Sequence, residues 1–192
     1  LEVISPMIKQ GVNPYTEASF TFRNRIARGL WGIVYTVFIK YSPRPMHKYR
    51  VFVISLFGAK LGKNCHIYPS AKIWAPWNLI MEDDTCIANE ANIYNMAVIT
   101  IRKRAIVSQG AHLCAGTHDY RDKNFQLYAL PITIEAEVWL CTECFIGPGV
   151  IVGEGTVIGA RAVVTKNTEK WMVYTGNPAK AIKKRIIKNE VG

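Results

Sequence analysis

Histidine is the side chain best suited to moving a proton near neutral pH, and this chain of 192 residues contains four. Three of them, His66, His112 and His118, stand five positions after an aliphatic residue of the repeat described below, so each is expected to face outward. His118 is distinct because it is the last residue before that repeat is interrupted. An outward imidazole in such a place could act as a general base.

Cysteines form the second candidate group. Cys141 and Cys144 make a Cys-x-x-Cys pair, a pattern that can bind zinc or exchange disulfides. No second pair accompanies it, and Cys144 occupies a small, inward position of the repeat, so we expect no metal site. His112 and His118 fall on different sides of the repeat, which also argues against a zinc site of three histidines. The odd total of five cysteines favours a reducing compartment over a disulfide framework.

The charge of the chain is +10, from 24 Lys and Arg against 14 Asp and Glu, and it is unevenly spread. Residues 1–60 carry nine basic and two acidic side chains, residues 61–169 nine and eleven, and residues 170–192 six and one. Two basic ends favour partners that carry phosphate, such as nucleotide-like cofactors, anionic lipid surfaces or nucleic acid. The ends contain no recognised nucleic-acid-reading motif, so nucleic acid is not an expected partner.

A six-residue repeat in the middle of the chain indicates how these residues are positioned. Fifteen hexads each begin with an aliphatic residue, and the residue four places later is small or β-branched in fourteen of them. Two extra residues enter after the third and after the sixth hexad, and the repeat is interrupted after the ninth. The aliphatic positions are Leu61, Ile67, Ile73, Met81, Ile87, Ile93, Ile101, Val107, Leu113, Ile134, Leu140, Ile146, Val152, Ile158 and Val164.

A period of six fits neither an α-helix nor an ordinary alternating strand, but it fits a short strand followed by a corner. Three such sides make one coil, and stacked coils make an all-β solenoid with parallel strands and the aliphatic residues inside. We predict about five coils over residues 61–169, with residues 119–133 leaving the column as a loop. Long loops in regular scaffolds are usually functional or disordered.

The flanking segments are predicted to be helical. Ala18 to Lys40 reads as a basic, aromatic helix, the segment 42–45 (Ser-Pro-Arg-Pro) must end it, and a second helix is expected from His47 to Phe57. Residues 1–60 would then cap the open end of the solenoid, and contact with a membrane surface is a compatible second role. In residues 170–192, Asn177 to Lys188 reads as a basic helix.

Three segments resemble the hexapeptide-repeat acyltransferases. Val107 to Tyr120 (VSQGAHLCAGTHDY) resembles the active-site stretch of that family, Val138 to Lys166 resembles its acetyl-CoA-binding coils, and Val173 to Arg185 (VYTGNPAKAIKKR) resembles its terminal Gly-Asn-Pro-Ala-Lys signature. Over residues 14–188 the chain resembles the acetyltransferases of colanic acid biosynthesis in bacterial exopolysaccharide clusters. The resemblance implies a left-handed β-helix and a homotrimer with three active sites between neighbouring columns.

The resemblance also implies roles for residues on the acceptor side. His118 matches the catalytic base of the family. Asn92 matches, across a two-residue gap, a catalytic-site asparagine that holds the acceptor, and Trp139 matches a tryptophan near the histidine. Asp119 adjoins the base as an acceptor-side residue that could orient it, although a backbone carbonyl or another carboxylate could do so equally.

The donor side follows in the same way. The backbone amides at Thr142 and Ala160 match positions that hold the pantetheine arm of acetyl-CoA, and one of them could also bind the oxyanion. Cys141 stands where the family usually has glycine, a departure that affects the geometry of this corner. Four basic residues lie where the phosphates of CoA are implied to bind, namely Lys166, Lys180, Lys183 and Arg185.

Together, these features lead us to expect an O-acetyltransferase that uses acetyl-CoA and no metal, and that acts on a sugar hydroxyl of an exopolysaccharide precursor. Two alternatives stay open, namely N-acetylation of an amino sugar and a non-catalytic scaffold at a membrane surface. The first residues show no basic-then-apolar leader pattern. The longest apolar run, Leu30 to Ile39, is half of what a membrane span needs. The expected location is the cytoplasm, with peripheral contact at the inner membrane.

Overall fold

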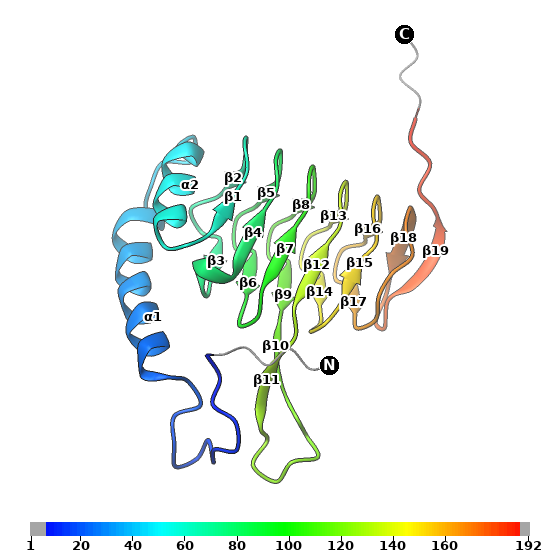
Figure 1. The fold of residues 1–192 in the computed structure, drawn as a ribbon. Helices are drawn as coiled ribbons and strands as arrows, with labels where there is room; N and C mark the ends of the chain where they lie inside the picture. The colour runs from blue at the N-terminus through cyan, green and yellow to red at the C-terminus, as the bar shows by residue number, and fades with distance from the viewer. Residues whose placement is uncertain (1–6, 189–192) are drawn as a thin grey trace.

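The computed structural model describes residues 7–188 and shows a three-sided column of stacked coils with helices at one end (Figure 1). Each side of the column is a sheet of very short parallel strands. The first face contains β1 (Lys60–Leu61), β4 (Leu79–Met81), β7 (Ile99–Ile101), β12 (Ile132–Ile134) and β15 (Ile151–Val152). The second face contains β2 (His66–Ile67), β5 (Cys86–Ile87), β8 (Ile106–Val107), β13 (Trp139–Leu140), β16 (Val157–Ile158), β18 (Met172–Thr175) and β19 (Lys180–Lys184). The third face contains β3 (Lys72–Ile73), β6 (Asn92–Tyr94), β9 (His112–Cys114), β14 (Phe145–Ile146) and β17 (Val163–Val164).

The interior of the column consists of the aliphatic residues that define the repeat. All fifteen except Leu61 are at most 5% exposed, which confirms the predicted core. Each lies directly above its counterpart in the coil below, as Ile87 pairs with Val107 and Val107 with Leu140 on the second face. The corners are equally tight, because a Cβ at Gly153 would lie 2.8 Å from the carbonyl oxygen of Thr168 in the next coil.

The interruption after the third coil is a β-hairpin rather than the loop predicted for residues 119–133. β10 (Gly116–His118) pairs antiparallel with β11 (Leu127–Ala129), and Figure 1 shows this hairpin projecting from the column. The chain rejoins the first face at β12, which begins at Ile132. Leu127 and Ala129 are buried, but an alternation this short gives too weak a signal to be recognised in the sequence.

The N-terminal helices cover the open end of the column. The chain forms α1 (Phe22–Val34), the π-helical turn η1 (Tyr35–Ile39), α2 (His47–Leu56) and the 3-10 turn η2 (Pro76–Asn78). Trp31 is buried, and its indole nitrogen donates a hydrogen bond of 2.7 Å to the carbonyl oxygen of Ile73 in the first coil. Both predicted helices and their capping role are therefore confirmed. None of the helices within residues 7–188 combines the length and the apolar character that crossing a bilayer requires.

One fully buried cation fastens α2 to the column. Arg50 is 0% exposed, and its guanidinium donates to the carbonyl oxygens of Ile67 (2.6 Å), Pro43 (2.8 Å) and Arg44 (2.6 Å), and to the hydroxyl of Ser42. Burial lowers the pKa of Arg50 from its ordinary value. The partners are neutral oxygens that lie in the segment between the two helices and in β2, so Arg50 ties three parts of the chain together.

The sequence prediction of a basic helix over residues 177–188 is wrong, because the C-terminal segment forms strands. β18 adds a further parallel strand to the second face beside β16, and β19 turns back to pair antiparallel with β18. The described residues 170–188 are therefore not a separate helical tail, because β18 continues the solenoid. The physical reason is the open edge of β16, whose unpaired backbone groups are satisfied by another strand and not by a helix.

Replacing Arg50 by Met should lower the free energy of unfolding by about 3 kcal/mol, because the buried carbonyl oxygen of Ile67 and the part-buried ones of Pro43 and Arg44 lose their donor, and a buried group without a partner costs about 1–3 kcal/mol. Urea denaturation followed by circular dichroism measures this difference. Lys48→Met on the same helix is the matched control, since the exposed Lys48 should change stability by less than about 0.5 kcal/mol. Equal effects of the two substitutions would contradict the anchoring role of Arg50.

Candidate active site

The hairpin leaves the column at the corner between its third and first faces. β9 of the third face leads into β10, and β11 leads into β12 of the first face. β10 starts against the preceding coil, where a Cβ at Gly116 would collide with the side chain of Met96 and crowd that of Tyr94. In a three-sided column this corner lies opposite the second face, so the hairpin presents its residues away from that face.

His118 ends β10 and is exposed at this corner. Its Nδ1 lies 2.6 Å from the carbonyl oxygen of Phe125 across the hairpin. Because a carbonyl oxygen can only accept, Nδ1 carries the proton in the neutral imidazole and Nε2 keeps a lone pair for a proton. The ring is thus held with its basic nitrogen outward. Phe125 stands at a φ of +48° in the turn, and nothing in the sequence pointed to it as the partner.

Asp119 does not contact His118 through its carboxylate. That carboxylate accepts from the backbone and side-chain nitrogens of Arg121, with the shortest side-chain contact at 3.1 Å. The hydrogen bonds from Arg121 lower the pKa of Asp119. Of the alternatives that the sequence left open for orienting the histidine, the structure therefore favours the backbone carbonyl, and Asp119 shapes the hairpin instead.

The third face carries Asn92 between the side chains of Lys72 and His112 from the adjacent coils. Asn92 on β6 pairs with Lys72 on β3 and with His112 on β9. His112 is half-buried against the edge of the Phe145 ring, and burial lowers its pKa. Its position on the flat face, away from the hairpin, separates it from His118 as the sequence indicated.

Trp139 lies on the second face, opposite the hairpin corner. It is 47% exposed on β13, and its indole nitrogen donates a hydrogen bond of 3.0 Å to the hydroxyl of Ser108. A face and the opposite corner of one column cannot enclose a common substrate. The structure therefore does not bring His118 and Trp139 together within one chain.

The two donor-side amides lie at the corner between the second and third faces. Thr142 and Ala160 occupy the same place in successive coils, and the carbonyl oxygen of Thr142 accepts from the amide of Arg161. In the described part of the chain, the backbone amides of Thr142 and Ala160 donate no hydrogen bond to the protein. Such exposed N–H groups can bind amide or carbonyl oxygens of a ligand.

The four basic residues of the donor side differ in exposure and in their hydrogen bonds. Lys166, Lys180 and Lys183 are exposed. Arg185 is half-buried, and its guanidinium donates to the carbonyl oxygens of Glu137 (2.7 Å) and Gly155 (2.8 Å). Arg185 therefore anchors the segment after β19 to the column, a task that the sequence did not suggest.

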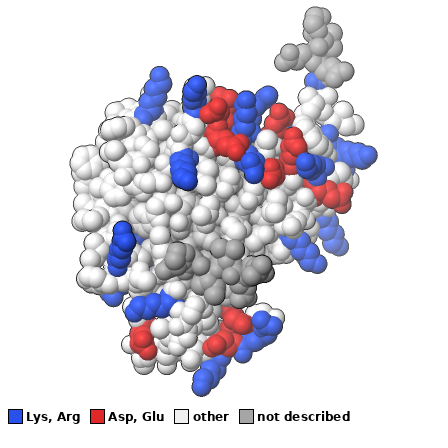
Figure 2. All heavy atoms as spheres, in the orientation of Figure 1, with Lys and Arg blue, Asp and Glu red and all other residues white. Residues whose placement is uncertain are grey.

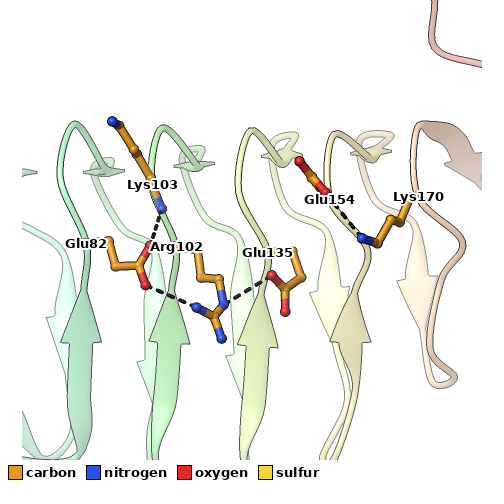
Figure 3. A network of polar contacts seen from close by, with 6 residues as sticks. All are labelled: Glu82, Arg102, Lys103, Glu135, Glu154 and Lys170. Atoms are coloured by element: carbon orange, nitrogen blue, oxygen red, sulfur yellow. Dashed lines mark hydrogen bonds and ion pairs between the residues drawn. The ribbon is translucent and has the colours of Figure 1, made fainter.

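Other charges of the column neutralise one another along one edge (Figure 3). Arg102 lies between Glu82 (3.2 Å) and Glu135 (3.1 Å), which belong to the coils on either side. Lys170 pairs with Glu154 at 3.3 Å further along. Exposed pairs of this kind contribute about 1 kcal/mol or less each, and they leave little positive charge at this edge for a ligand.

The Cys-x-x-Cys pair has the properties of core thiols. Cys144 is fully buried, and burial raises its pKa to about 12. Burial also raises the pKa of Cys141. Both thiols are therefore protonated at neutral pH, whereas metal binding and disulfide exchange require thiolate.

A six-residue-repeat solenoid with an oriented histidine at one corner and open backbone amides at another has the architecture of the hexapeptide-repeat acyltransferases. The chain is 40% identical over 163 residues to the colanic acid biosynthesis acetyltransferase WcaF of Escherichia coli (strain K12), which covers 85% of this chain and 90% of that protein. It is 32% identical over 122 residues to the galactoside O-acetyltransferase of the same organism, covering 64% of this chain and 55% of the relative. No family model matches.

Solved structures give the same fold. A maltose O-acetyltransferase from Clostridium difficile 630 superposes with a TM-score of 0.79 at 20% identity, covering 87% of this chain and 90% of the other. The hexapeptide-repeat acetyltransferase VCA0836 of Vibrio cholerae, solved with acetyl coenzyme A, gives 0.78 at 22% identity, with 87% and 91% covered. The chain belongs to the hexapeptide-repeat acetyltransferases, close to those of colanic acid biosynthesis, and the expected left-handed β-helix is confirmed.

Replacing His118 by Asn should lower turnover by about 10²–10⁴-fold, because general-base catalysis typically contributes that much. The affinity for CoA should stay close to that of the unchanged protein, since His118 is exposed and has its structural contact only within the hairpin. Steady-state kinetics and calorimetric titration with CoA measure the two quantities. His112→Asn is the control on the neighbouring face, and turnover of the His118 variant within threefold of that control would remove His118 from the mechanism.

Proposed function

We propose that the protein transfers the acetyl group of acetyl-CoA to a sugar hydroxyl of an exopolysaccharide precursor. The observation that carries this proposal is the imidazole of His118, which is oriented by the Phe125 carbonyl with Nε2 available for a proton. The relationship to the colanic acid acetyltransferases supports both the donor and the class of acceptor. An acceptor screen that records CoA release tests it, and release that no sugar stimulates would contradict it.

The reaction needs two proton transfers, one to the imidazole of His118 and one from it. His118 Nε2 takes the proton of the acceptor hydroxyl while that oxygen attacks the thioester carbonyl carbon, and a tetrahedral intermediate forms with a negative oxygen. A backbone amide at Thr142 or Ala160 is placed to donate to that oxygen. The carbon–sulfur bond then breaks, the CoA thiolate leaves and takes up the proton held by the imidazolium, and the acetyl ester remains on the sugar.

The proposal includes a homotrimer, which the placement of these groups supports. His118 is at the corner between the third and first faces. Trp139 lies on the second face, and the amides of Thr142 and Ala160 lie at the corner between the second and third faces. A neighbouring column that turns its second face toward the hairpin would bring the two sets together. Three columns related by a threefold axis would make three such sites, each with residues from two chains.

The donor is proposed to lie along the groove between the columns. Lys166, Lys180 and Lys183 have exposed ammonium groups that can pair with the phosphates of CoA. Arg185 contributes indirectly, because its contacts with two carbonyl oxygens hold β19 and its lysines in place. In this division of roles the three lysines supply the phosphate contacts, in keeping with the expectation that at least two of the four basic residues touch phosphate.

Two further features of the proposal concern the acceptor. An amino sugar would need the same base, so N-acetylation is the alternative that the acceptor screen must distinguish. A lipid-linked acceptor would place the protein at the cytoplasmic surface of the membrane. Contact there is supported by the outer side of α1, where Phe22, Ile26, Leu30 and Ile33 are each about half exposed or more.

Replacing Lys180 and Lys183 together by Ala should raise the KM for acetyl-CoA by about tenfold or more, since hydrogen bonds to charged groups contribute about 1.5–3 kcal/mol each. The effect should be smaller with acetyl-pantetheine, which lacks the adenosine phosphates. Lys184→Ala, which removes a neighbouring charge on β19, is the control.

Arg185→Ala separates anchoring from phosphate binding. It should impair both donors to the same extent and lower thermal stability, because two backbone carbonyls lose their donor. Equal losses for both donors in the double lysine variant would show that these lysines also work through structure.

A further inference from the structure

A cavity of about 600 Å³ opens between α1 and the third face of the column, beside the first two coils. Helix α1 contributes Arg25, Arg28 and two glycines to its lining, and the third face contributes Lys72, Trp74 and Asn92. Asn92 is the residue that the sequence assigned to the acceptor. The cavity therefore lies beside the proposed acceptor site and belongs to no step derived so far.

The charge of this cavity is positive. Among the residues that the structure describes, three cations line it and no carboxylate does. The whole stretch from Ala18 to Met81 contains ten Lys and Arg and no Asp or Glu. Figure 2 agrees with this, since the acidic groups gather along the edge of the column and around the hairpin, whereas the helical end shows basic groups on an uncharged surface. A concave site of this kind concentrates anions.

Arg28 is held in place for such a role. Its guanidinium lies 4.4 Å from the centre of the Trp74 ring and 4.9 Å from that of Phe20. Its Nε is buried and has no hydrogen-bond partner in the described structure. Burial lowers the pKa of Arg28 from its ordinary value. A stacked, partly desolvated guanidinium with an unused donor is suited to phosphate.

Two glycines keep the cavity open at a cost to the helix. Gly29 and Gly32 lie in the interior of α1, where glycine is about 1 kcal/mol less favourable than alanine. A Cβ at either position would have no atom within 4 Å, so close packing does not explain them. Their effect is to leave the helical wall of the cavity without side chains.

A line of aromatic contacts connects the cavity to the hairpin. Trp74 lies 5.7 Å from Tyr94, ring centre to ring centre. Tyr94 in turn packs against Gly116, two residues before His118. These contacts form a continuous surface from the cavity along the third face toward the corner that carries His118.

We propose that this cavity binds a phosphate group of the acetyl acceptor, so that the saccharide passes Asn92 and presents its hydroxyl toward the hairpin corner that carries His118. The proposal rests on the acetyl-transfer function above and narrows its acceptor to a phosphorylated saccharide. The phosphate could be that of a soluble sugar phosphate or that of a lipid-linked sugar. The cations Arg25, Arg28 and Lys72 would bind it in either case.

Calorimetric titration of the full chain with inorganic pyrophosphate and with glucose 1-phosphate tests the site directly, and glucose is the uncharged control. The titrations are repeated with desulfo-CoA, which occupies the donor site and so prevents the probes from binding there. Arg28→Met and Lys72→Met should each weaken binding by about tenfold, as expected for a charged hydrogen bond. Gly32→Met should abolish binding while leaving the melting temperature unchanged or raised. Arg23→Met, on the other side of α1, should bind as the unchanged protein does.

Three results would contradict a phosphate site in the cavity. They are no binding of pyrophosphate or glucose 1-phosphate, equal weakening of that binding by Arg23→Met and Arg28→Met, and loss of pyrophosphate binding when desulfo-CoA is present. These results do not depend on acetyl transfer, so failure of the proposed function would be recognised separately by the acceptor screen. A protein that binds pyrophosphate in the cavity but acetylates no sugar would refute the function and leave an anion site.

The source of the phosphate is distinguished by vesicles of phosphatidylcholine with phosphatidylglycerol. Ile33 is exposed on the outer side of α1 and does not line the cavity. A lipid-linked acceptor is supported if the protein binds these vesicles at low salt and if Ile33→Glu abolishes that binding without changing the affinity for pyrophosphate. Absence of vesicle binding supports a soluble sugar phosphate and overturns the lipid-linked source.

Discussion

The hydrogen bonds between successive coils fix the direction of every side chain on the column. Each coil repeats the register of the one below, so a residue's place in the hexad decides whether it faces the core, a face or a corner. Catalytic and binding groups can therefore lie only at corners, in outward positions or on segments that leave the repeat. His118 is on such a segment, whereas Trp139 and Asn92 lie on different faces. The proposed sharing of the site between columns is a direct consequence of this geometry.

The irregular parts of the chain supply what the column cannot. The hairpin provides the Phe125 carbonyl that holds the ring of His118. The helices provide a cap fastened by Arg50 and one wall of a cationic cavity. The last strands close the edge of the second face and carry exposed lysines. The helices and the last strands also satisfy backbone groups of the column, at Ile67, at Ile73 and along β16, so the same elements stabilise the column and carry polar groups of the proposed sites.

The sequence was sufficient to predict the core, the helices and the break in the repeat, because each depends on a local pattern. A buried residue such as Ile146 recurs at a fixed period, and Pro43 and Pro45 end a helix wherever they occur. The C-terminal strands were mistaken for a helix because their structure depends on the open edge of β16, which no local pattern reveals. The anchoring role of Arg185 was missed for the same reason, since its backbone carbonyl partners are distant in the chain. The partner of His118 was missed because the hairpin that brings the nearby Phe125 carbonyl to it was not predicted.

The most direct test of a site shared between columns uses mixed trimers of two inactive variants. His118→Ala removes the base, and Ala160→Trp blocks the exposed corner proposed to receive pantetheine. Co-expression with two different affinity tags allows trimers that contain both chains to be isolated. If each site takes its base from one chain and its donor corner from the next, every mixed trimer, whatever its ratio of the two chains, has about one functional site in three. Mixed trimers as inactive as either parent would contradict the account.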